Sequence, residues 1–392
     1  MIKYIGSKRS LVPLIRSVAS RLPVRTACDL FAGTTRVGQA LRSLGLTVHS
    51  NDLATYSEAL GQAYIAADAS VDRRRLGGLL AELSLLEGKD GYFTEAFCRQ
   101  ARYLQPHNGR RIDAIREAID HHALDPIERG IVLTSLLEAA DRVDSTTGLQ
   151  MAYLMGWAPR SYGELELRLP GEVAGPAGTV TRLDANLLAR QLDVDLVYVD
   201  PPYNQHSYFS NYHVWETLVR WDAPESYGVA NKRVDCRDRK SAYNSKRAAP
   251  AALAGLFGAL QAPWLLVSVN NEGFHAVKGL NELLLEHGYV GRIDVDFARY
   301  IGARIGIHNP AGDKVGSVTH VRNREHLFLV GPDRDLVTEV VAEAQALAAI
   351  PAAVSQAAAI SGPSDAAGAS SAVAASRAEP PAAAAQGPRP RR

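Results

Sequence analysis

Thr26-Ala-Cys-Asp-Leu-Phe31 is a short apolar strand pattern, and the glycine-containing turn Ala32-Gly-Thr-Thr35 follows it directly. The next residues, from Val37 to Leu44, carry apolar side chains at helical spacing until Gly45 ends the pattern. Leu46-Thr-Val-His-Ser-Asn-Asp52 is typical of a second strand. A strand, a helix and a strand in this order form a βαβ unit, in which the two strands are parallel. We therefore expect an α/β protein with a parallel sheet.

Further strand patterns appear in the second half of the chain. They share apolar or alternating side chains, and they are Thr179–Leu183, Val194–Val199, Trp264–Val269, Arg292–Tyr300 and His326–Val330. The last two alternate as the strands of a terminal hairpin do. The sheet that begins in the N-terminal unit is therefore expected to resume after residue 174.

The regions around these strands differ in composition. Ile112–Ile119 and Ile131–Ala140 are periodic helix segments, and Leu165–Leu169 is predicted to be one short strand. From about residue 344 the chain is rich in Ala, Pro, Ser and Gly, which cannot bury a core. We predict four regions. Residues 1–71 form a first part of the core and residues 72–174 a largely helical insertion. Residues 175–335 form the second part of the core, and residues 336–392 are a disordered Ala/Pro-rich tail.

Composition limits the class of protein. The chain has 392 residues, of which 46% are hydrophobic, and a formal net charge of +1, so any surface that binds nucleic acid must be local. Cys28, Cys98 and Cys236 have no paired spacing, so we expect buried thiols and neither a disulfide framework nor a metal site. No apolar run reaches the ~18 residues of a membrane span, and the N-terminus lacks the apolar core of a signal peptide. We expect a soluble, cytoplasmic protein.

Asp200-Pro-Pro-Tyr203 follows the apolar strand pattern Val194–Val199. The two prolines fix two φ angles and remove two backbone donors, so the carbonyl groups here point outward without partners in the sheet. Together with the Asp200 carboxylate and the flat ring of Tyr203, these carbonyl groups suit a planar ligand that bears an NH₂ group. The amine of a nucleobase is such a group.

Gly33 and Asp52 indicate a second ligand at the neighbouring strand ends. Glycine in the turn lets the backbone approach a ligand, and a carboxylate that ends the next strand, here 19 residues later, often accepts from ribose hydroxyls. Thr35 stands where a pyrophosphate-binding loop has a second glycine. The pattern favours a cofactor with adenosine and no pyrophosphate, such as S-adenosylmethionine. A structural turn and a helix cap are the alternative explanations of Gly33 and Asp52.

Three further segments each have two interpretations. Tyr4-Ile-Gly-Ser-Lys8 precedes a helix pattern, either as a ligand-binding segment or as an N-terminal cap with a solvated lysine. Asp184 follows a strand pattern and either reaches the adenine of the same cofactor or caps a helix. The loop Lys232–Arg247 is rich in Lys and Arg, and it either follows nucleic-acid phosphates or is a solvated charged face.

Five motifs occur in the order seen in Dam-type (alpha-class) DNA adenine methyltransferases, and the chain resembles that family over about residues 1–331. The motifs are Tyr4–Lys8, Asp29–Gly33, Asn51–Asp52, Asp184 and Asp200–Tyr203. Other stretches are similar to relatives that accompany restriction enzymes: Asn211–Glu216, Val269–Gly273, Gly316–His320 and Glu325–Phe328. The resemblance implies a class I S-adenosylmethionine-dependent methyltransferase fold. That fold has a Rossmann-like sheet of seven strands with the last strand antiparallel, here with a largely helical insertion.

The resemblance also implies a role for each matched position. Tyr4 and Lys8 match positions that contact S-adenosylmethionine, and Asp29 to Gly33 match the loop under its methionine part. Asp52 matches the ribose contact, and Asp184 matches the position near the cofactor's adenine. The catalytic segment, whose first residue also lies beside the cofactor, consists of Asp200, Pro201, Pro202 and Tyr203. Two positions depart from the family pattern. Thr35 stands where relatives often have a glycine, and Ala185 stands where some relatives have an aromatic residue.

The implied activity is site-specific methylation of DNA. A methyl group passes from S-adenosylmethionine to the exocyclic amino group of an adenine that is flipped out of the duplex. The implied partners are double-stranded DNA and a cognate restriction endonuclease, with no membrane, and residues 72–174 are the candidate region for target recognition. The alternatives are methylation of an amine in RNA or protein and an inactive DNA-binding module with the same fold. A nicotinamide-dependent oxidoreductase is disfavoured by the incomplete glycine pattern.

Overall fold

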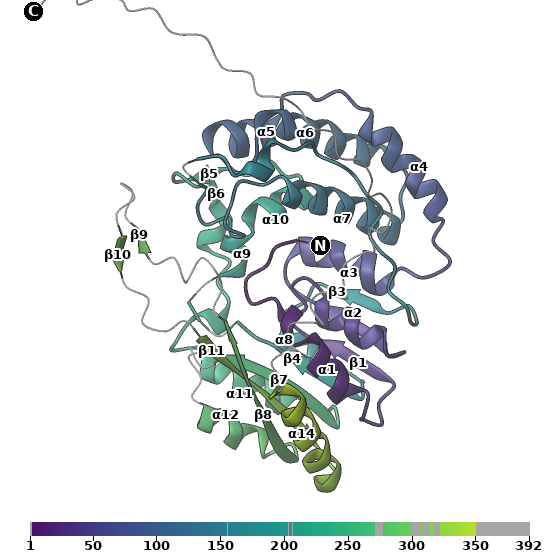
Figure 1. Ribbon diagram of the computed structural model, residues 1–392, viewed down its shortest axis with the longest axis vertical. Coiled ribbons are helices and arrows are strands. Elements are labelled where there is room, and N and C mark those ends of the chain that lie inside the picture. The colour runs from purple at the N-terminus through teal and green to yellow at the C-terminus, as the bar shows by residue number, and fades with distance from the viewer. Residues whose placement is uncertain are drawn as a thin grey trace, which may run out of the picture.

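The computed structural model describes residues 2–154, 156–202, 204–205, 207–270, 277–298, 307–308, 314–316 and 322–349. In this part of the chain a seven-stranded sheet forms the lower part of the molecule as drawn in Figure 1, and a layer of helices lies above it. The N-terminal segment lies between the two (Figure 1). Among the described residues, no helix has the length and apolar character needed to cross a membrane.

The central sheet has the strand order β3-β2-β1-β4-β7-β11-β8. Its strands are β1 Thr26–Asp29, β2 Thr47–Asn51, β3 Thr179–Thr181, β4 Leu196–Val199, β7 Trp264–Asn270, β8 Tyr289–Ala298 and β11 Arg322–Gly331. The first five pair in parallel, whereas β11 is antiparallel to both β7 and β8. The α/β class, the seven-stranded sheet with an antiparallel last strand and the terminal hairpin are therefore confirmed.

Strand β4 is buried on both faces, which is why its sequence is a continuous apolar run. Leu196 and Tyr198 belong to the core on one face of the sheet, whereas Val197 and Val199 belong to the core on the other. Successive side chains of a strand point to opposite faces, so one strand supplies both cores. Helices therefore cover both faces of the sheet.

The covering helices come from several parts of the chain. One face is covered by α1 Val12–Ala19, α2 Arg36–Arg42 and α14 Arg334–Ala348. The other face is covered by α8 Ala185–Leu188, α11 Ala249–Ala259 and α12 Val277–Leu284. A 3₁₀ turn, η1 Lys8–Ser10, precedes α1, and the side chain of Ser7 makes no capping hydrogen bond to it.

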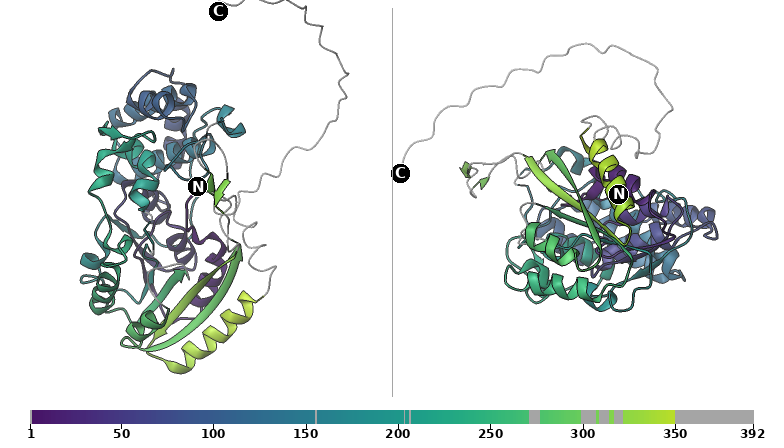
Figure 2. Two further views of the ribbon diagram at one scale, coloured as in Figure 1. Left: turned by 90° about the vertical axis from the view of Figure 1, so that its left-hand side faces the viewer. Right: turned by 90° about the horizontal axis from the view of Figure 1, so that it is seen from below.

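The prediction that the disordered tail begins at residue 336 is wrong, because helix α14 extends to Ala348. Figure 2 shows this helix, in yellow-green, against the strands of the sheet. Val337, Val340 and Ala344 are buried there. Apolar side chains three and four residues apart give the helix a face to bury, although the composition resembles that of the following residues. Residues 350–392 lie outside the described part of the chain.

The helical layer is built from three separate parts of the chain. The predicted insertion supplies α4 Arg73–Ser84, α5 Tyr92–Thr94, α6 Pro106–His121 and α7 Pro126–Arg142, which confirms the helices expected in α6 and α7. The other members are α3 Thr55–Gly61, α9 Tyr208–Asn211 and α10 His213–Arg220. One hydrophobic core joins the three parts, and it includes Leu60 of α3, Leu137 of α7 and Leu218 of α10. The insertion therefore shares its core with segments on either side of it.

The strand predicted at Leu165–Leu169 is wrong. Among the described residues this segment pairs with no strand. Its backbone donates to side chains instead: Leu165 N to Asn108 Oδ1 at 2.9 Å, and Arg168 N to Ser135 Oγ at 3.0 Å. Every second residue of the segment packs against the helical core. The alternation of apolar and polar residues therefore arises because one side of this extended segment faces the helices, and not because the segment pairs in a sheet.

Shorter elements complete the described chain. They are η2 Gln62–Ala66, η3 Glu95–Gln100, η4 Pro159–Tyr162, β5 Ser226–Tyr227, β6 Lys232–Arg233, η5 Val234–Arg237, η6 Ala242–Asn244, β9 Ile307–His308 and β10 Lys314–Gly316. Strand β5 pairs with β6 and β9 pairs with β10, both antiparallel. Helix η6 reaches the end of the sheet where a cavity opens.

The cysteine side chains are buried, as expected. Cys28 lies in β1, Cys98 in η3 and Cys236 in η5. Burial raises the pKa of each thiol above its ordinary value, which keeps the thiols protonated and unreactive.

Candidate active site

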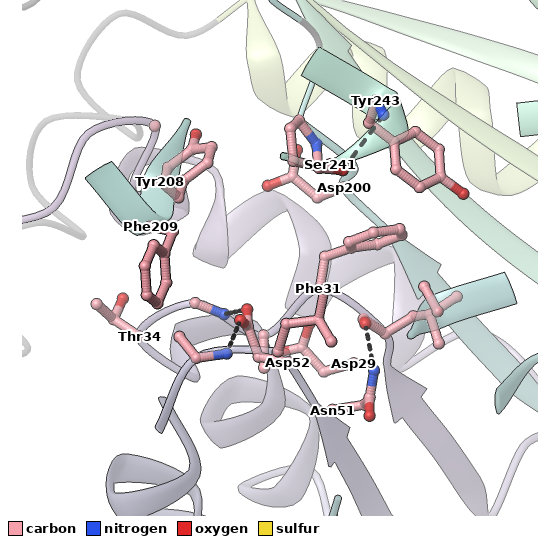
Figure 3. Close-up of a pocket in the computed structure, with 18 of the residues that line it drawn as sticks. Asp29, Phe31, Thr34, Asn51, Asp52, Asp200, Tyr208, Phe209, Ser241 and Tyr243 are labelled. Carbon is pink, nitrogen blue, oxygen red and sulfur yellow. Dashed lines mark hydrogen bonds between the residues drawn. The ribbon is translucent and has the colours of Figure 1, made fainter. Parts of the chain in front are cut away.

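A cavity of about 590 Å³ opens at the carboxyl ends of β1, β2 and β4. Strands β1 and β4 are neighbours, and the chain leaves them toward opposite edges of the sheet. This is the topological switch point, where open α/β sheets bind their ligands. Figure 3 shows Asp29 and Asp52 on one side of the cavity, Asp200 and Tyr243 on another, and Phe209 between them at the left.

The cavity brings most of the predicted site residues together. The predicted residues that line it are Tyr4, Lys8, Asp29, Gly33, Asp52, Asp184, Asp200 and Pro202. Pro201 is buried within the same segment as Asp200 and Pro202. Tyr203 lies outside the described residues, so its stacking role stays a prediction. Motifs from several strand ends and from the N-terminal segment thus meet at one place.

Asp52 holds the Gly33 turn in place. Its Oδ2 atom accepts from Gly33 N at 2.9 Å, and its Oδ1 atom accepts from Ala54 N at 2.9 Å (Figure 3). Gly33 has a φ of 52°, and a Cβ atom there would lie 3.0 Å from Tyr4 Cε1, so the turn requires glycine. Each carboxylate oxygen has two lone pairs, so Asp52 keeps acceptor capacity toward the cavity.

The neighbouring Asn51 ties three strand ends together. Its Nδ2 atom donates to Leu30 O at 3.2 Å after β1 and to Leu183 O at 3.0 Å after β3. Its Oδ1 atom accepts from Leu183 N at 3.0 Å and from Thr181 Oγ1 at 2.8 Å. Asn51 thereby fixes the end of β2, and with it the position of Asp52.

Thr35, where relatives often have glycine, adopts the left-handed conformation with a φ of 59°. This conformation is uncommon for a β-branched residue. Thr35 is buried, and its hydroxyl donates to Thr34 O at 2.7 Å and accepts from Gln39 Nε2 at 2.9 Å. The substitution therefore retains the backbone shape of the turn, and two side-chain hydrogen bonds stabilise it.

Asp29 ends β1 and is buried in the cavity wall. Its Oδ2 atom accepts from Gly38 N of α2 at 2.8 Å. Burial raises the pKa of Asp29 to about 7; the Gly38 N–H opposes this shift, and the negative charges of Asp200 and Asp52 add to it. Asp29 thus joins β1 to α2 and adds to the acidity of the cavity.

Asp184 caps helix α8, which confirms the N-cap interpretation, and it also lines the cavity. Its Oδ1 atom accepts from Asn186 N at 2.9 Å. The side chain of Asn186 accepts from the Tyr243 hydroxyl at 2.6 Å, and the Tyr243 ring meets Phe31 edge-on with 5.3 Å between centroids. Phe31 therefore gives an apolar wall near Asp184 that suits the flat face of a purine. Contact with the cofactor's adenine stays a prediction.

Lys8 is a buried side chain, so its interpretation as a solvated lysine is wrong. Its ammonium nitrogen lies 3.0 Å from Asp200 Oδ1 and 2.5 Å from Glu325 Oε1. Burial raises the pKa of Asp200 to about 7; the positive charge of Lys8 lowers it, and the negative charge of Glu325 raises it. Glu325 of β11 belongs to the stretch Glu325–Phe328, which resembles relatives that accompany restriction enzymes. Nothing in the sequence indicated that its side chain comes close to Asp200.

Arg36 lines the cavity and was not predicted from the sequence. It is the first residue of α2, directly after the turn that contains Gly33. In the described part of the chain no acidic side chain forms an ion pair with it. Burial lowers the pKa of Arg36 and the positive charge of Arg9 adds to this effect, whereas Tyr64 and the negative charge of Glu138 oppose it. A half-buried guanidinium in such surroundings suits an anionic group of a ligand.

Tyr4 belongs to a stack of tyrosine rings at the edge of the cavity. Its ring centroid lies 4.5 Å from that of Tyr212 and 5.3 Å from that of Tyr208, with interplanar angles of 16° and 21°. The Tyr212 hydroxyl accepts from Ile5 N at 2.6 Å. Tyr208 and Phe209 of α9 line the cavity as well (Figure 3). The stack thus fastens the N-terminal segment to α9 and the helical layer.

The basic loop Lys232–Arg247 divides into buried and exposed cations. Arg233 is buried, and its guanidinium pairs with Asp222 at 2.6 Å and with Asp235 at 3.0 Å. This arginine cannot contact a phosphate, which corrects the expectation for one member of the loop. The exposed cations of the loop are Arg237, Arg239, Lys240, Lys246 and Arg247.

The fold and the cavity define the class of the protein. A sheet of this order, with an antiparallel β11 between β7 and β8 and a cavity at the ends of β1 and β4, is the Rossmann-like architecture of class I methyltransferases. The chain belongs to the D12 class N6 adenine-specific DNA methyltransferases, since the model of that family matches residues 4–249. The family expected from the motifs is thereby confirmed.

Three bacterial modification methylases and type II methyltransferases illustrate the similarity. The chain is 30% identical over 312 residues to modification methylase StsI of Streptococcus sanguinis, and 28% identical over 314 residues to the type II methyltransferase M.NlaIII of Neisseria lactamica. It is 30% identical over 308 residues to M.FokI of Planomicrobium okeanokoites. These matches cover 75%, 76% and 73% of this chain. They cover 48% of StsI, 92% of M.NlaIII and 47% of M.FokI, so the chain spans about half the length of two relatives and nearly all of the third.

Proposed function

We propose that this chain transfers a methyl group from S-adenosylmethionine to the exocyclic amino group of an adenine flipped out of double-stranded DNA. The observation that carries the proposal is the Asp200 carboxylate at the end of β4, which lines the cavity at the switch point of the sheet. The family match supports adenine as the methylated base. The type II methyltransferases among the relatives support a cognate restriction endonuclease as a further partner.

The cavity residues fit S-adenosylmethionine, which carries a carboxylate, a sulfonium, two ribose hydroxyls and a purine. We assign the methionine part to the turn of Gly33, which lines the cavity beside Tyr4. We assign the ribose to Asp52, whose carboxylate keeps acceptor capacity. We assign the purine to the wall that Phe31 forms near Asp184, and the methionine carboxylate to Arg36.

The chain's own residues prepare the target amine. When bound, S-adenosylmethionine supplies the methyl group from its sulfonium, and the electrons of the broken carbon–sulfur bond leave with sulfur. The Asp200 carboxylate and the Pro201 carbonyl accept the two amino hydrogens, which frees the nitrogen lone pair to form the new bond to carbon. The methylated nitrogen then loses one proton. Burial raises the pKa of Asp200 to about 7, so its carboxylate is basic enough to hold that proton on its way to water.

Single-molecule sequencing of DNA from cells that express the chain tests this proposal. We expect N6-methyladenine at one short recurring sequence, and none in cells that express the Asp200→Ala variant. Methylated RNA or protein together with unmodified DNA would show that the substrate assignment is wrong. Binding of S-adenosylmethionine without any methylated product would indicate the inactive DNA-binding module instead.

Replacing Arg36 by methionine should weaken the binding of S-adenosylmethionine by roughly 10- to 100-fold, because an ion pair with the cofactor's carboxylate is lost. Methionine keeps most of the length of the side chain and removes the charge. Isothermal calorimetry with purified protein measures the affinity without any need for turnover.

Decarboxylated S-adenosylmethionine is the matched control ligand for this variant, because it lacks only the carboxylate. We expect the wild type and Arg36→Met to bind it equally well. Equal weakening for both ligands would mean that Arg36 supports the shape of the cavity and does not pair with the carboxylate. A loss of DNA affinity in place of cofactor affinity would assign Arg36 to a phosphate.

A further inference from the structure

A buried cluster of three charged groups lies behind the proposed catalytic carboxylate. Lys8 Nζ is 3.0 Å from Asp200 Oδ1 and 2.5 Å from Glu325 Oε1, and the side chains of Lys8 and Glu325 are only 7% and 2% exposed. The three groups come from η1, from the end of β4 and from β11. Lys8 and Glu325 are 317 residues apart in the chain, so the fold alone brings them together.

The cluster contains two carboxylates and one ammonium. Lys8 can neutralise only one of them, so the cluster has one negative charge in excess when both acids are ionised. Charges interact strongly in a buried site, where little water screens them, so the charge of Glu325 affects the ionisation of Asp200. Ser268 of β7 also donates a hydrogen bond to Glu325 Oε1, which helps to hold the Glu325 carboxylate in place.

We propose that Glu325 is a positioning residue for methyl transfer: acting through Lys8, it fixes the orientation of the Asp200 carboxylate and sets the pH at which that carboxylate becomes ionised. The inference rests on the proposed function, in which Asp200 accepts the hydrogens of the target amine.

Orientation follows from the geometry of the cluster. A lysine side chain has four rotatable bonds and gains little order from a single partner. Glu325 holds the Lys8 ammonium as a second partner, and the ammonium in turn holds Asp200 Oδ1, an atom that is fully enclosed. The Asp200 side chain keeps 17% exposure, so its remaining surface faces the cavity that the target amine would enter.

The charges around Asp200 decide the direction of each pH effect. Among the described residues, Lys8 from η1 lowers the pKa of Asp200, and Glu325 from β11 raises it. Asp29 at the end of β1 and Tyr198 of β4 are also close enough to be affected by the Asp200 charge, and Asn270 of β7 is a neutral neighbour at the same strand ends. Removing the charge of Glu325 should therefore lower the pKa of Asp200, and removing the charge of Lys8 should raise it.

The first test compares pH profiles of kcat/KM, which report the free enzyme. We expect the acid limb of Glu325→Gln to move to lower pH by about one unit, and that of Lys8→Met to move to higher pH. A merely structural role would lower activity without moving the limb. A profile of Glu325→Gln that coincides with the wild type, or a shift of both variants in the same direction, would overturn the inference.

Two further variants separate charge from position and from general damage. Glu325→Asp keeps the charge but withdraws it by one methylene, so we expect a lower kcat with the acid limb unmoved. Glu87→Gln makes the same chemical change at an exposed acid and should leave both kcat and the profile as in the wild type. A moved acid limb in Glu325→Asp would contradict the assigned effect of charge.

The second test measures protons and needs no turnover. S-adenosylmethionine is a cation at its sulfonium, so its binding near neutral pH should drive a proton from Asp200. Calorimetry in buffers of different ionisation enthalpy measures that release, and we expect the wild type to release more than Glu325→Gln. Equal release would overturn the inference. Absence of S-adenosylmethionine binding in the wild type would instead refute the proposed function, which keeps the two failures distinct.

Discussion

Replacing Asp200 by alanine should lower the rate of methyl transfer by roughly 1,000-fold or more and leave DNA binding intact. The variant removes the acceptor that we propose aligns the target amine, but it removes no positively charged side chain that could bind a DNA phosphate. The fold should survive, because Lys8 keeps Glu325 as its partner at 2.5 Å and no buried cation is left unpaired. A tritiated-methyl assay measures the transfer, and a gel-shift assay measures the affinity for DNA.

Asp193→Ala is the matched control for this prediction, because it removes an exposed acid near the other end of the same strand. We expect the control to have wild-type activity. Asp200→Asn should be nearly as inactive as Asp200→Ala, since its amide would turn N–H groups toward the hydrogens of the target amine. Substantial activity in Asp200→Ala would refute the role assigned to the carboxylate.

The central sheet could be predicted from the sequence because its strands carry strong local signals. Strand β4 is a continuous apolar run, since both of its faces are buried, and Gly45 ends the helix that joins the first two strands. The order of the strands needed the family resemblance, because pairings between distant segments have no local signature. The segment Leu165–Leu169 shows the limit of periodicity: packing on helices produced the same alternation as a half-buried strand.

Residues that line the cavity were predictable where they directly follow a strand. Asp52 and Asp200 follow strands directly, and parallel strands bring their carboxyl ends to one edge of the sheet. The partners of these residues were not predictable. Glu325 reaches Lys8 from the far end of the chain, and the ion pairs that bury Arg233 form between loops with no repeating pattern. Such contacts arise only when separate elements pack.

The helical layer explains why the insertion could not be delimited from composition alone. Helices α3 and α10 pack into the same hydrophobic core as α7, although they come from different regions of the chain. Glu216 of α10 accepts from Thr55 N at the start of α3 at 2.9 Å, so the layer is tied to the segment that follows Asp52. This hydrogen bond joins the helical layer to the edge of the cavity.

Replacing Asp52 by asparagine should greatly reduce the preference of the cavity for a ribose. Each hydrogen bond to a charged acceptor contributes about 1.5–3 kcal/mol, so two ribose hydroxyls should favour S-adenosylhomocysteine over its 2′,3′-dideoxy analogue by roughly 100-fold or more in the wild type. In Asp52→Asn the amide oxygen can still accept from Gly33 N or Ala54 N, which helps to keep the turn. We expect the discrimination between the two ligands to fall to roughly tenfold or less.

The comparison of two ligands separates the two roles of Asp52. If Asp52 only holds the Gly33 turn, Asp52→Asn will weaken both ligands equally and the ribose preference will persist. If Asp52 contacts the ribose, the variant will lose affinity for the ribose ligand alone, because the dideoxy ligand makes no bond there to lose. Asp193→Asn, an exposed site with the same chemical change, should leave both affinities unchanged. Calorimetry on the four combinations of protein and ligand therefore assigns the carboxylate to the turn, to the cofactor or to both.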